Sequence, residues 1–396
     1  MKKVEKNGMN GKERVKKTVN HKKTDRPACS FEATYEVTAE LIKFFGIDRR
    51  KDYKFGSLSG SNQPGIGDKN KKFGLQHELE LKKILGIDQS IVICPVNPAK
   101  TIGNWWGVPL LSRFPDGKIL GAWNIIFEEW KYPYGTYIEI HRSPLINASL
   151  DEIRKVKLPH LEWWDFDSYV DLLKNYGDFF VWMNMNGCFD MARFQRGSEQ
   201  FFMDMALEPE KAEILLEKVN NLAMAFFEKA IAKVKGLVDG VYLGDDFGTQ
   251  NGLSISPEMW RKFIKPKYKE LVSMIKNHGL KYCHHSCGGI RPIIPDMIEI
   301  GFDVLNPIQP LAKGMDSEEL GNEFGKDIAF YGGIDEQKTL PFGSVEDVRK
   351  EVLQRIATLG KYDGYIVAPA HAFQPDSPIE NILAVYETVL GCSFDK

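Results

Sequence analysis

Residues 266–289 read PKYKELVSMIKNHGLKYCHHSCGG and contain a complete helix-to-strand unit. Apolar residues from Pro266 to Asn277 follow a helix-like pattern, and the apolar run from Leu280 to His285 is typical of a short buried strand. Gly288 and Gly289 then allow the backbone to turn sharply. This unit predicts a helix packed on a buried sheet, with His285 and Cys287 where the strand ends.

The same alternation of strand and helix patterns recurs along the chain. Candidate strands are Ala28–Phe31, Ser90–Pro95, Phe179–Met185, Gly240–Leu243, Leu280–His285, Asp303–Leu305, Ile328–Tyr331 and Tyr365–Ala368. The helical patterns between them include Pro209–Val234, Pro257–Asn277, Arg291–Ile300, Ser344–Leu359 and Ile379–Leu390. Strands separated by helices favour parallel pairing with right-handed crossovers. Eight such strands predict an α/β fold in the form of a (β/α)8 TIM barrel.

A long insertion at about 97–178 separates the second and third predicted strands. Alternating residues in Lys118–Phe127 and Thr136–His141 predict a β-hairpin over one end of the barrel. Most aromatic side chains here are expected to pack on one another, whereas Trp105 and Trp106 are candidates for a docking contact. The aromatic residues are Trp105, Trp106, Trp123, Trp130, Tyr132, Tyr134, Tyr137, Trp163 and Trp164.

Composition and charge narrow the class of protein. The chain has 396 residues, 43% of them hydrophobic, and a formal net charge of -2, which argues against nucleic acid as a partner. Residues 1–24 are basic and lack the apolar core of a signal peptide, so we expect a flexible lead-in before a single domain over 25–396. No apolar run reaches the roughly 18 residues of a membrane span. The six cysteines are scattered, which suits a reducing cytoplasm.

His285 and Cys287 are two residues apart at a strand end, so both side chains are expected to point to the same side. Zinc commonly binds cysteine and histidine together, and a catalytic zinc site needs a third protein ligand and one open position. The pair is therefore half of a candidate metal site. The alternative is a buried cysteine beside a hydrogen-bonded histidine.

Polar residues follow several other predicted strands, at the end where barrel enzymes place their chemistry. Asp245 and Asp246 follow the fourth strand. One of them is expected to cap the next helix, and either could donate a proton. His371 follows the eighth strand without a capping role, so it is predicted to be a metal ligand or an acid–base residue. The candidates for substrate binding are Glu32, Gln250, Asn306, Gln309 and Asp335.

From residue 14 to residue 390 the chain resembles the uroporphyrinogen decarboxylase superfamily, which includes cobalamin-dependent methyltransferases with a (β/α)8 fold. The motifs that carry the resemblance are Asp25-Arg26-Pro27, Leu85-Gly86-Ile87-Asp88, Arg196-Gly197, Ser256-Pro257-Glu258, His285-Ser286-Cys287-Gly288, Asp303-Val304-Leu305-Asn306 and Pro375-Asp376-Ser377-Pro378-Ile379-Glu380-Asn381. Decarboxylases of the superfamily bind a tetrapyrrole with many carboxylates through an arginine-rich segment after the first strand. This chain has Glu32 and Glu36 there, and Cys94-Pro95-Val96 where those enzymes have an aspartate. The acidic residues disfavour that substrate.

The resemblance to the methyltransferases implies a zinc site formed by His285, Cys287 and a later residue, for which His371 is the best correspondence. Those methyltransferases have a cysteine at the later position, and a histidine in its place makes the metal a stronger Lewis acid. This suits the removal of a methyl group from a methoxylated aromatic or a methylamine-type donor, with Asp246 or Asp245 donating the proton. The alternatives are a methylcorrinoid:thiol methyltransferase, a decarboxylase of a small carboxylated substrate and a non-catalytic corrinoid-binding subunit.

The methyl acceptor implied by the resemblance is cobalamin carried on a partner corrinoid protein. The chain has no corrinoid-binding motif of the Asp-x-His-x-x-Gly kind. We therefore expect a corrinoid protein to dock at the open end of the barrel, with Trp105 and Trp106 as its contacts. No oligomeric state is predicted.

Overall fold

Eight parallel strands form a nearly closed barrel in the computed structural model, which describes residues 8–47, 74–133 and 135–394. Their order around the barrel is β1 (Ala28–Cys29), β15 (Tyr365–Val367), β14 (Ala329–Tyr331), β13 (Val304–Asn306), β12 (Lys281–His285), β9 (Gly240–Gly244), β8 (Phe180–Asn186) and β2 (Gln89–Ile93). The first and last strands of this order, β1 and β2, meet where the Asp88 N–H donates to the Cys29 carbonyl at 3.0 Å. The (β/α)8 barrel expected from the sequence is present, and each candidate strand corresponds to one of its strands.

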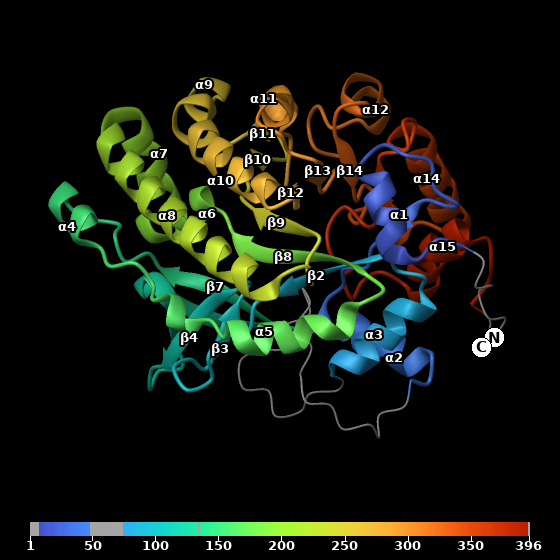
Figure 1. The fold of residues 1–396 in the computed structure, drawn as a ribbon, viewed down its shortest axis with the longest axis horizontal. Coiled ribbons are helices and arrows are strands. Elements are labelled where there is room, and N and C mark those ends of the chain that lie inside the picture. The colour runs from blue at the N-terminus through green and yellow to red at the C-terminus, as the bar shows by residue number, and fades with distance from the viewer. Residues whose placement is uncertain (1–7, 48–73, 134, 395–396) are drawn as a thin grey trace.

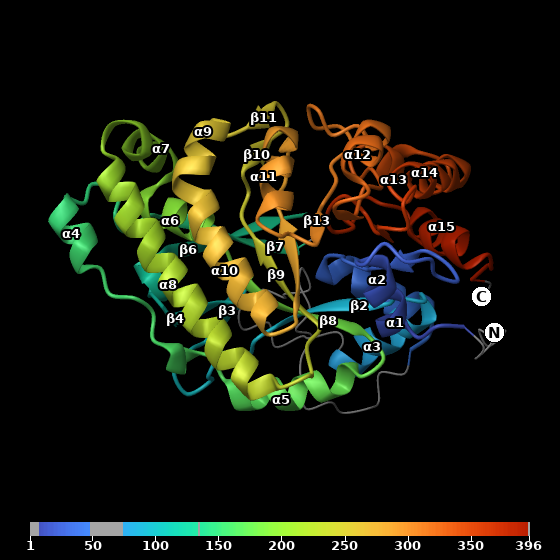
Figure 2. The same cartoon turned by 45° about the horizontal axis from the view of Figure 1, so that its top comes forward.

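Helices surround the strands on the outside of the barrel (Figure 1; Figure 2). They are α2 (Tyr35–Phe44), α3 (Leu75–Ile84), α6 (Cys188–Arg196), α7 (Ser198–Leu207), α8 (Pro209–Val234), α9 (Pro257–Met259), α10 (Lys265–Asn277), α11 (Ile294–Glu299), α12 (Ser317–Phe324), α13 (Thr339–Phe342), α14 (Val345–Thr358) and α15 (Ile379–Leu390). The helix predicted over Pro257–Asn277 contains a π-helical turn at Trp260–Ile264, between α9 and α10. The one predicted over Arg291–Ile300 begins with a 3-10 turn at Arg291–Ile293.

The insertion forms a separate antiparallel sheet of five strands beside the barrel. These are β3 (Gly103–Trp105), β4 (Val108–Arg113), β5 (Ile119–Gly121), β6 (Ile126–Tyr132) and β7 (Gly135–Arg142), followed by the helices α4 (Leu150–Lys155) and α5 (Phe166–Leu173). The hairpin predicted from Lys118–Phe127 and Thr136–His141 is therefore wrong in its first strand, because β6 pairs with β7 and β5 is a separate strand. Trp123 and Asn124 have positive φ angles of 65° and 59°, which interrupts the run between β5 and β6. Tyr134 lies outside the described residues.

The basic segment before the first strand is not a flexible lead-in over its described residues, 8–24. It contains the helix α1 (Gly11–Thr18), which Asn10 caps by accepting a hydrogen bond from the Glu13 N–H at 2.8 Å. Val15 and Val19 belong to the same buried cluster as side chains inside the barrel, such as Trp182 and Tyr331. The helix forms because this apolar face covers the amino-terminal end of the barrel.

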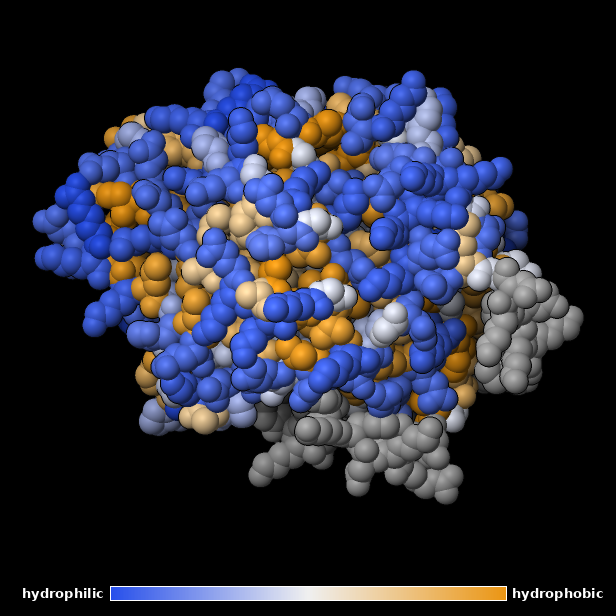
Figure 3. Space-filling view, in the orientation of Figure 1, coloured by the Kyte–Doolittle hydropathy of each residue, from blue (hydrophilic) through white to orange (hydrophobic). Residues whose placement is uncertain are grey.

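Apolar residues fill both the inside of the barrel and the space between strands and helices. The face of the molecule in Figure 3 is largely hydrophilic, with apolar residues gathered near its centre. Among the described helices, none has the length and hydropathy that crossing a membrane requires.

Candidate metal centre

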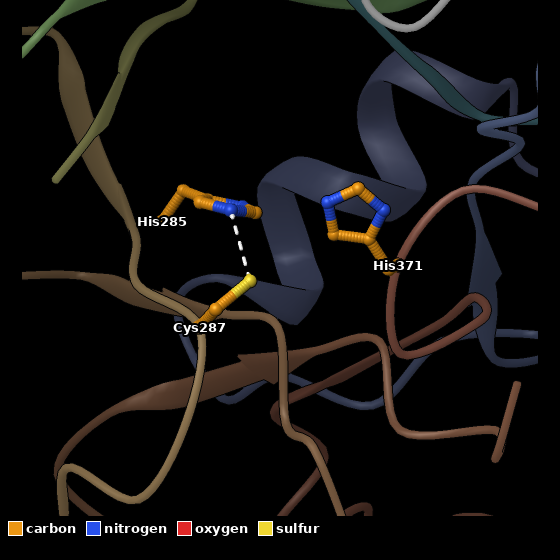
Figure 4. A group of neighbouring side chains, drawn as sticks. All are labelled: His285, Cys287 and His371. Carbon is orange, nitrogen blue, oxygen red and sulfur yellow. Dashed lines mark hydrogen bonds between the residues drawn. The ribbon is translucent and has the colours of Figure 1, made fainter. Parts of the chain in front are cut away.

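The three predicted ligands come together at the carboxyl-terminal end of the barrel. His285 ends β12, Cys287 follows two residues later, and His371 lies on the loop after β15. One donor atom from each residue lies within 4.8 Å of the other two. Figure 4 shows His371 facing the other two side chains from a different part of the chain. We call these three residues the metal triad.

The imidazole of His285 is oriented by two neighbours on adjacent strands. In the sheet register His285 lies opposite Asn306 of β13 and Gly244 of β9. The Asn306 Oδ1 lies 2.7 Å from the His285 Nδ1, and the Tyr242 hydroxyl lies 2.7 Å from both atoms. Because an amide oxygen only accepts hydrogen bonds, the Nδ1 carries the proton and the Nε2 lone pair is left for a metal.

A tight turn places Cys287 beside His285. The Cys287 N–H donates to the Asp246 carboxylate at 2.8 Å, and the Gly288 N–H donates to the Gln309 side chain at 2.7 Å. Gly288 has a φ of 82°, and a Cβ there would lie 2.4 Å from the backbone of the β10–β11 hairpin (Gly248–Thr249 and Gly252–Leu253). This position requires glycine for both reasons.

Burial controls the protonation of the other two ligands. It lowers the pKa of His371 to about 4, and the neighbouring His285 contributes to the shift, so His371 is neutral with a free lone pair at neutral pH. Burial, followed by the carboxylates of Asp246 and Glu336, holds the pKa of the Cys287 thiol well above its usual value. A metal would therefore have to displace a proton from this thiol when it binds.

Two further carboxyl groups lie close to the metal triad. Glu32 follows β1 and accepts a hydrogen bond from the Tyr331 hydroxyl; burial raises its pKa, and its charge interacts with His285. Glu336 follows β14, and burial together with Asp335, Glu32 and Asp376 raises its pKa to about 8. With Asp246, these groups make the surroundings of the triad acidic.

The two aspartates predicted as proton donors have different positions. Asp245 is fully buried and accepts hydrogen bonds from the Phe189 and Asp190 N–H groups at 2.8 Å and from the Tyr268 hydroxyl. It therefore stabilises the amino-terminal end of α6, the helix after β8, and not the helix that follows Asp245 itself. This packing is so close that a Cβ at Gly187 would lie 2.2 Å from the Asp245 carboxyl group. Asp245 thus holds protein groups, whereas the Asp246 carboxylate lies 3.8 Å from the His285 Nε2. A catalytic role for either aspartate stays a prediction.

Three of the residues predicted to bind substrate form hydrogen bonds with other groups of the protein. Asn306 is buried against His285, and Gln309 is buried against the Gly288 turn. The Asp335 carboxylate accepts hydrogen bonds from the Gln337 N–H at 2.9 Å and the Thr339 N–H at 3.4 Å, which shapes its own loop. Gln250 is exposed in the turn of the β10–β11 hairpin. Glu32 is the one of this group whose charge interacts with the triad.

Tyr242 and Glu336 also lie at this end of the barrel but were not predicted from the sequence. Tyr242 is two residues before Gly244 on β9, so strand alternation would have predicted that it points to the same side as the end of that strand. Glu336 directly follows Asp335, just as Asp246 follows Asp245. In both acidic pairs the second residue is the one near the triad, which a pattern of adjacent acids does not reveal.

A cavity of about 610 Å³ lies at the opposite end of the barrel, among α1, the end of α8 and the start of β12. Two of its lysines already have partners, because Lys12 pairs with Asp239 at 2.9 Å and Lys281 pairs with Asp303 at 3.0 Å. The cavity contains none of the triad, and barrel enzymes place their chemistry at the other end. We therefore place the candidate site at the triad.

Known proteins share the sequence pattern and the fold of this chain. The family model described as uroporphyrinogen decarboxylase (URO-D) matches residues 142–391. Two curated relatives, both named methylcobamide:CoM methyltransferase MtaA and both from Methanosarcina barkeri, are 22% identical over 188 residues, which is 48% of this chain and 51% of theirs. The chain thus spans about half the length of the curated relatives it matches. The solved structure of a methyltransferase from Methanosarcina mazei covers 96% of this chain and 98% of its own, with a TM-score of 0.63 and 17% identity, which shows a shared fold.

Proposed function

The chain belongs to the uroporphyrinogen decarboxylase family, and we propose that it is a zinc-dependent methyltransferase that moves a methyl group from a methylated small molecule to a corrinoid protein. The observation that carries the proposal is the metal triad, with its oriented His285, at the carboxyl-terminal end of the barrel. The names of the relatives support the reaction class.

The residues present fit zinc. Zinc–nitrogen and zinc–sulfur bonds of about 2.1 and 2.3 Å at a tetrahedral angle put the two donor atoms about 3.6 Å apart. The His285 Nε2 and the Cys287 Sγ are 3.6 Å apart. Histidine bound through one nitrogen and hydrogen-bonded through the other is also the usual arrangement at zinc sites. His285, Cys287 and His371 would hold the ion and leave one position open for the substrate.

When bound, zinc would supply a Lewis acid for the heteroatom that loses its methyl group. The protein's own residues orient and surround this position. Asn306 and Tyr242 fix His285, and Asp246 fixes Cys287 by accepting its N–H. The methyl acceptor is expected to approach from the open end of the barrel, since the other end is covered by α1.

The charges around the triad indicate the type of substrate. Glu32, Asp246 and Glu336 offer no positive charge to an anionic substrate, such as a tetrapyrrole with many carboxylates, which would lose its hydration here without gaining a counter-charge. They are compatible with a neutral or cationic methyl donor. This supports demethylation of a small donor over decarboxylation of an anionic substrate.

Methyl transfer from a corrinoid to a thiol is the second candidate function. It is favoured by the names of the two curated relatives, which are methylcobamide:CoM methyltransferases. The acidic surroundings of the triad argue against a thiol substrate that also bears a negative charge.

The two functions are distinguished by supplying each substrate with free cobalamin. Wild-type protein with zinc should convert cob(I)alamin to methylcobalamin, followed by absorbance, with a methoxylated aromatic or a quaternary ammonium compound. Cys287→Ala should lose this activity, and Cys392→Ala, which changes an exposed cysteine, should keep it. Demethylation of methylcobalamin by a thiol, without activity on any methyl donor, would instead support the second function. Activity that survives complete chelation of metal would contradict both.

A further inference from the structure

The loop between β14 and α13 contains Glu336, a carboxyl group with a buried oxygen atom that lacks a hydrogen-bond partner among the described residues. Asp335 shapes this loop through its bonds to the Gln337 and Thr339 N–H groups, and its own N–H donates to Glu351 at 3.1 Å. Glu336, the next residue, takes no part in these bonds. Its Oε2 is buried and forms no hydrogen bond within the part of the chain that the structure describes.

Electrostatic interactions connect Glu336 with the metal triad and its neighbours. It is one of the carboxyl groups that raise the pKa of Cys287. In turn, Glu32, which interacts with His285, and Asp376, on the segment after His371, act on Glu336. These neighbours come from the ends of β1, β12 and β15, so Glu336 lies where the loops of the open end converge.

Burial among other acids favours the neutral form of this group. With a pKa of about 8, Glu336 is mostly a carboxylic acid at neutral pH. A protonated carboxyl group has one O–H to donate. Because a buried polar atom without a partner costs free energy, the unpartnered Oε2 of Glu336 at this end of the barrel indicates a ligand that completes the bond.

We propose that Glu336 is the general acid of this site and that the methyl donor is a methyl ether, most simply a methoxylated aromatic. The inference rests on the proposed function and specifies its substrate class. An ether oxygen leaves with negative charge and needs a proton, whereas a quaternary ammonium group leaves as a neutral amine and needs none.

The proposed step transfers the methyl group of the ether to cobalt. The carbon–oxygen bond of the ether breaks, and the methyl carbon forms a bond with the electron pair of the cobalt(I) of the corrinoid. The oxygen keeps the electron pair of the broken bond and takes the proton of Glu336. The products are a methylated corrinoid, an alcohol or phenol, and Glu336 as a carboxylate, which regains its proton from water before the next turnover.

Asp246, for which the sequence suggested this role, has a different function in this scheme. Its Oδ1 accepts the Cys287 N–H at 2.8 Å. We regard it as a positioning residue for Cys287. Asp246→Asn should therefore weaken metal binding, whereas Glu336→Gln should leave the metal in place.

The first test measures methyl transfer to free cob(I)alamin from aryl methyl ethers whose phenols differ in pKa. Glu336→Gln should lower kcat between about 100-fold and 10,000-fold for the poorest leaving groups and far less for activated ones. The control is Glu346→Gln, at an exposed glutamate of α14, which should match wild type. The kcat of wild type should also fall as the pH rises through the pKa of Glu336, about 8, and this fall should be absent in Glu336→Gln.

Each outcome of this test decides a different claim. An equal loss for all ethers, or none, would overturn the role of Glu336 while leaving the methyltransferase proposal intact. Activity of wild type on quaternary ammonium compounds and on no ether would overturn the substrate class. Wild type that moves no methyl group from any donor would overturn the proposed function and this inference together.

The second test needs no activity. Infrared spectra of the metal-free protein at neutral pH should contain a protonated carboxyl band that is absent in Glu336→Gln and present in Glu346→Gln. If Glu336→Gln does not fold, Glu336→Asp is used instead, and its carboxyl band should be shifted relative to wild type. Identical carboxyl bands in wild type and in the folded variant would contradict the proposal.

Discussion

The hydrogen bond from His285 to Asn306 decides which imidazole nitrogen is available to the metal. Without the Asn306 oxygen, His285 can rotate or exchange its tautomer, and part of the metal affinity is lost. We expect Asn306→Ala to reduce zinc affinity about 10-fold to 100-fold, measured by competition with a chromophoric chelator. Asn322→Ala, at an exposed position of α12, serves as the control. Unchanged affinity in Asn306→Ala would mean that the bond does not orient the ligand.

Residue type and position at strand ends predicted His285, Cys287 and His371 as metal ligands, and the structure brings the three side chains together. Residue type and position could not distinguish residues that contact a substrate from residues that stabilise a loop. Asn306 and Asp335 occupy strand-end positions of the same kind as His371, but their side chains turn to neighbouring protein groups. Whether such a side chain faces the site or a neighbouring protein group depends on packing between segments that are distant in the sequence.

At the scale of elements, α1 has the clearest energetic role. Its Arg14 is 5% exposed and pairs with Asp25 at 2.7 Å and with Asp88 at 2.5 Å, and Arg26 pairs with Asp88 at 2.8 Å. Three of these residues belong to the motifs that carry the family resemblance, and here they join α1 to the amino-terminal end of the barrel. Ion pairs at that end of a barrel usually serve stability.

Arg14→Ala should destabilise the protein by about 3–5 kcal/mol, because it leaves the buried Asp88 carboxylate with Arg26 as its remaining ion-pair partner. Chemical denaturation measures this change. The exposed Lys16 on the same helix provides the control substitution Lys16→Ala, which should have little effect. Zinc content should be unchanged in Arg14→Ala, since the triad lies at the other end of the barrel. A loss of stability similar to that of the control would show that α1 is not anchored by this network.

The barrel strands could be predicted as elements because each is a short apolar run between helical patterns. The sheet of the insertion was predicted only in part. Its strands depend on residues such as Trp123, whose left-handed conformation breaks an otherwise alternating run. The order in which β3 to β7 pair is also set by tertiary contacts that alternation alone does not contain.

At the scale of the whole molecule, the insertion is the element best placed for contact with a partner. Tyr137 of β7 donates to the Gln374 side chain at 3.0 Å, on the segment that follows His371. The two tryptophans proposed for docking differ in environment. Trp105 packs on Phe127 and Phe194 and donates to the Ile138 carbonyl at 3.0 Å, whereas Trp106 is 37% exposed.

Trp106→Ala should therefore raise the apparent KM for a corrinoid protein and leave methyl transfer to free cob(I)alamin nearly unchanged. Trp105→Ala should lower the melting temperature and reduce both activities. Steady-state kinetics with each acceptor and a thermal melt of both variants check this pair. If Trp106→Ala affects both acceptors equally, the docking surface lies elsewhere.

The metal content of the purified protein tests the central claim most directly. Mass spectrometry after supplementation with zinc should find a single zinc ion per chain in wild type and in Cys392→Ala. Cys287→Ala and His371→Ala should have lost most of it while keeping the melting behaviour of a folded barrel. Equal, near-zero zinc in wild type and in Cys287→Ala would contradict the account, because the triad would then be a hydrogen-bonded cluster and not a metal centre.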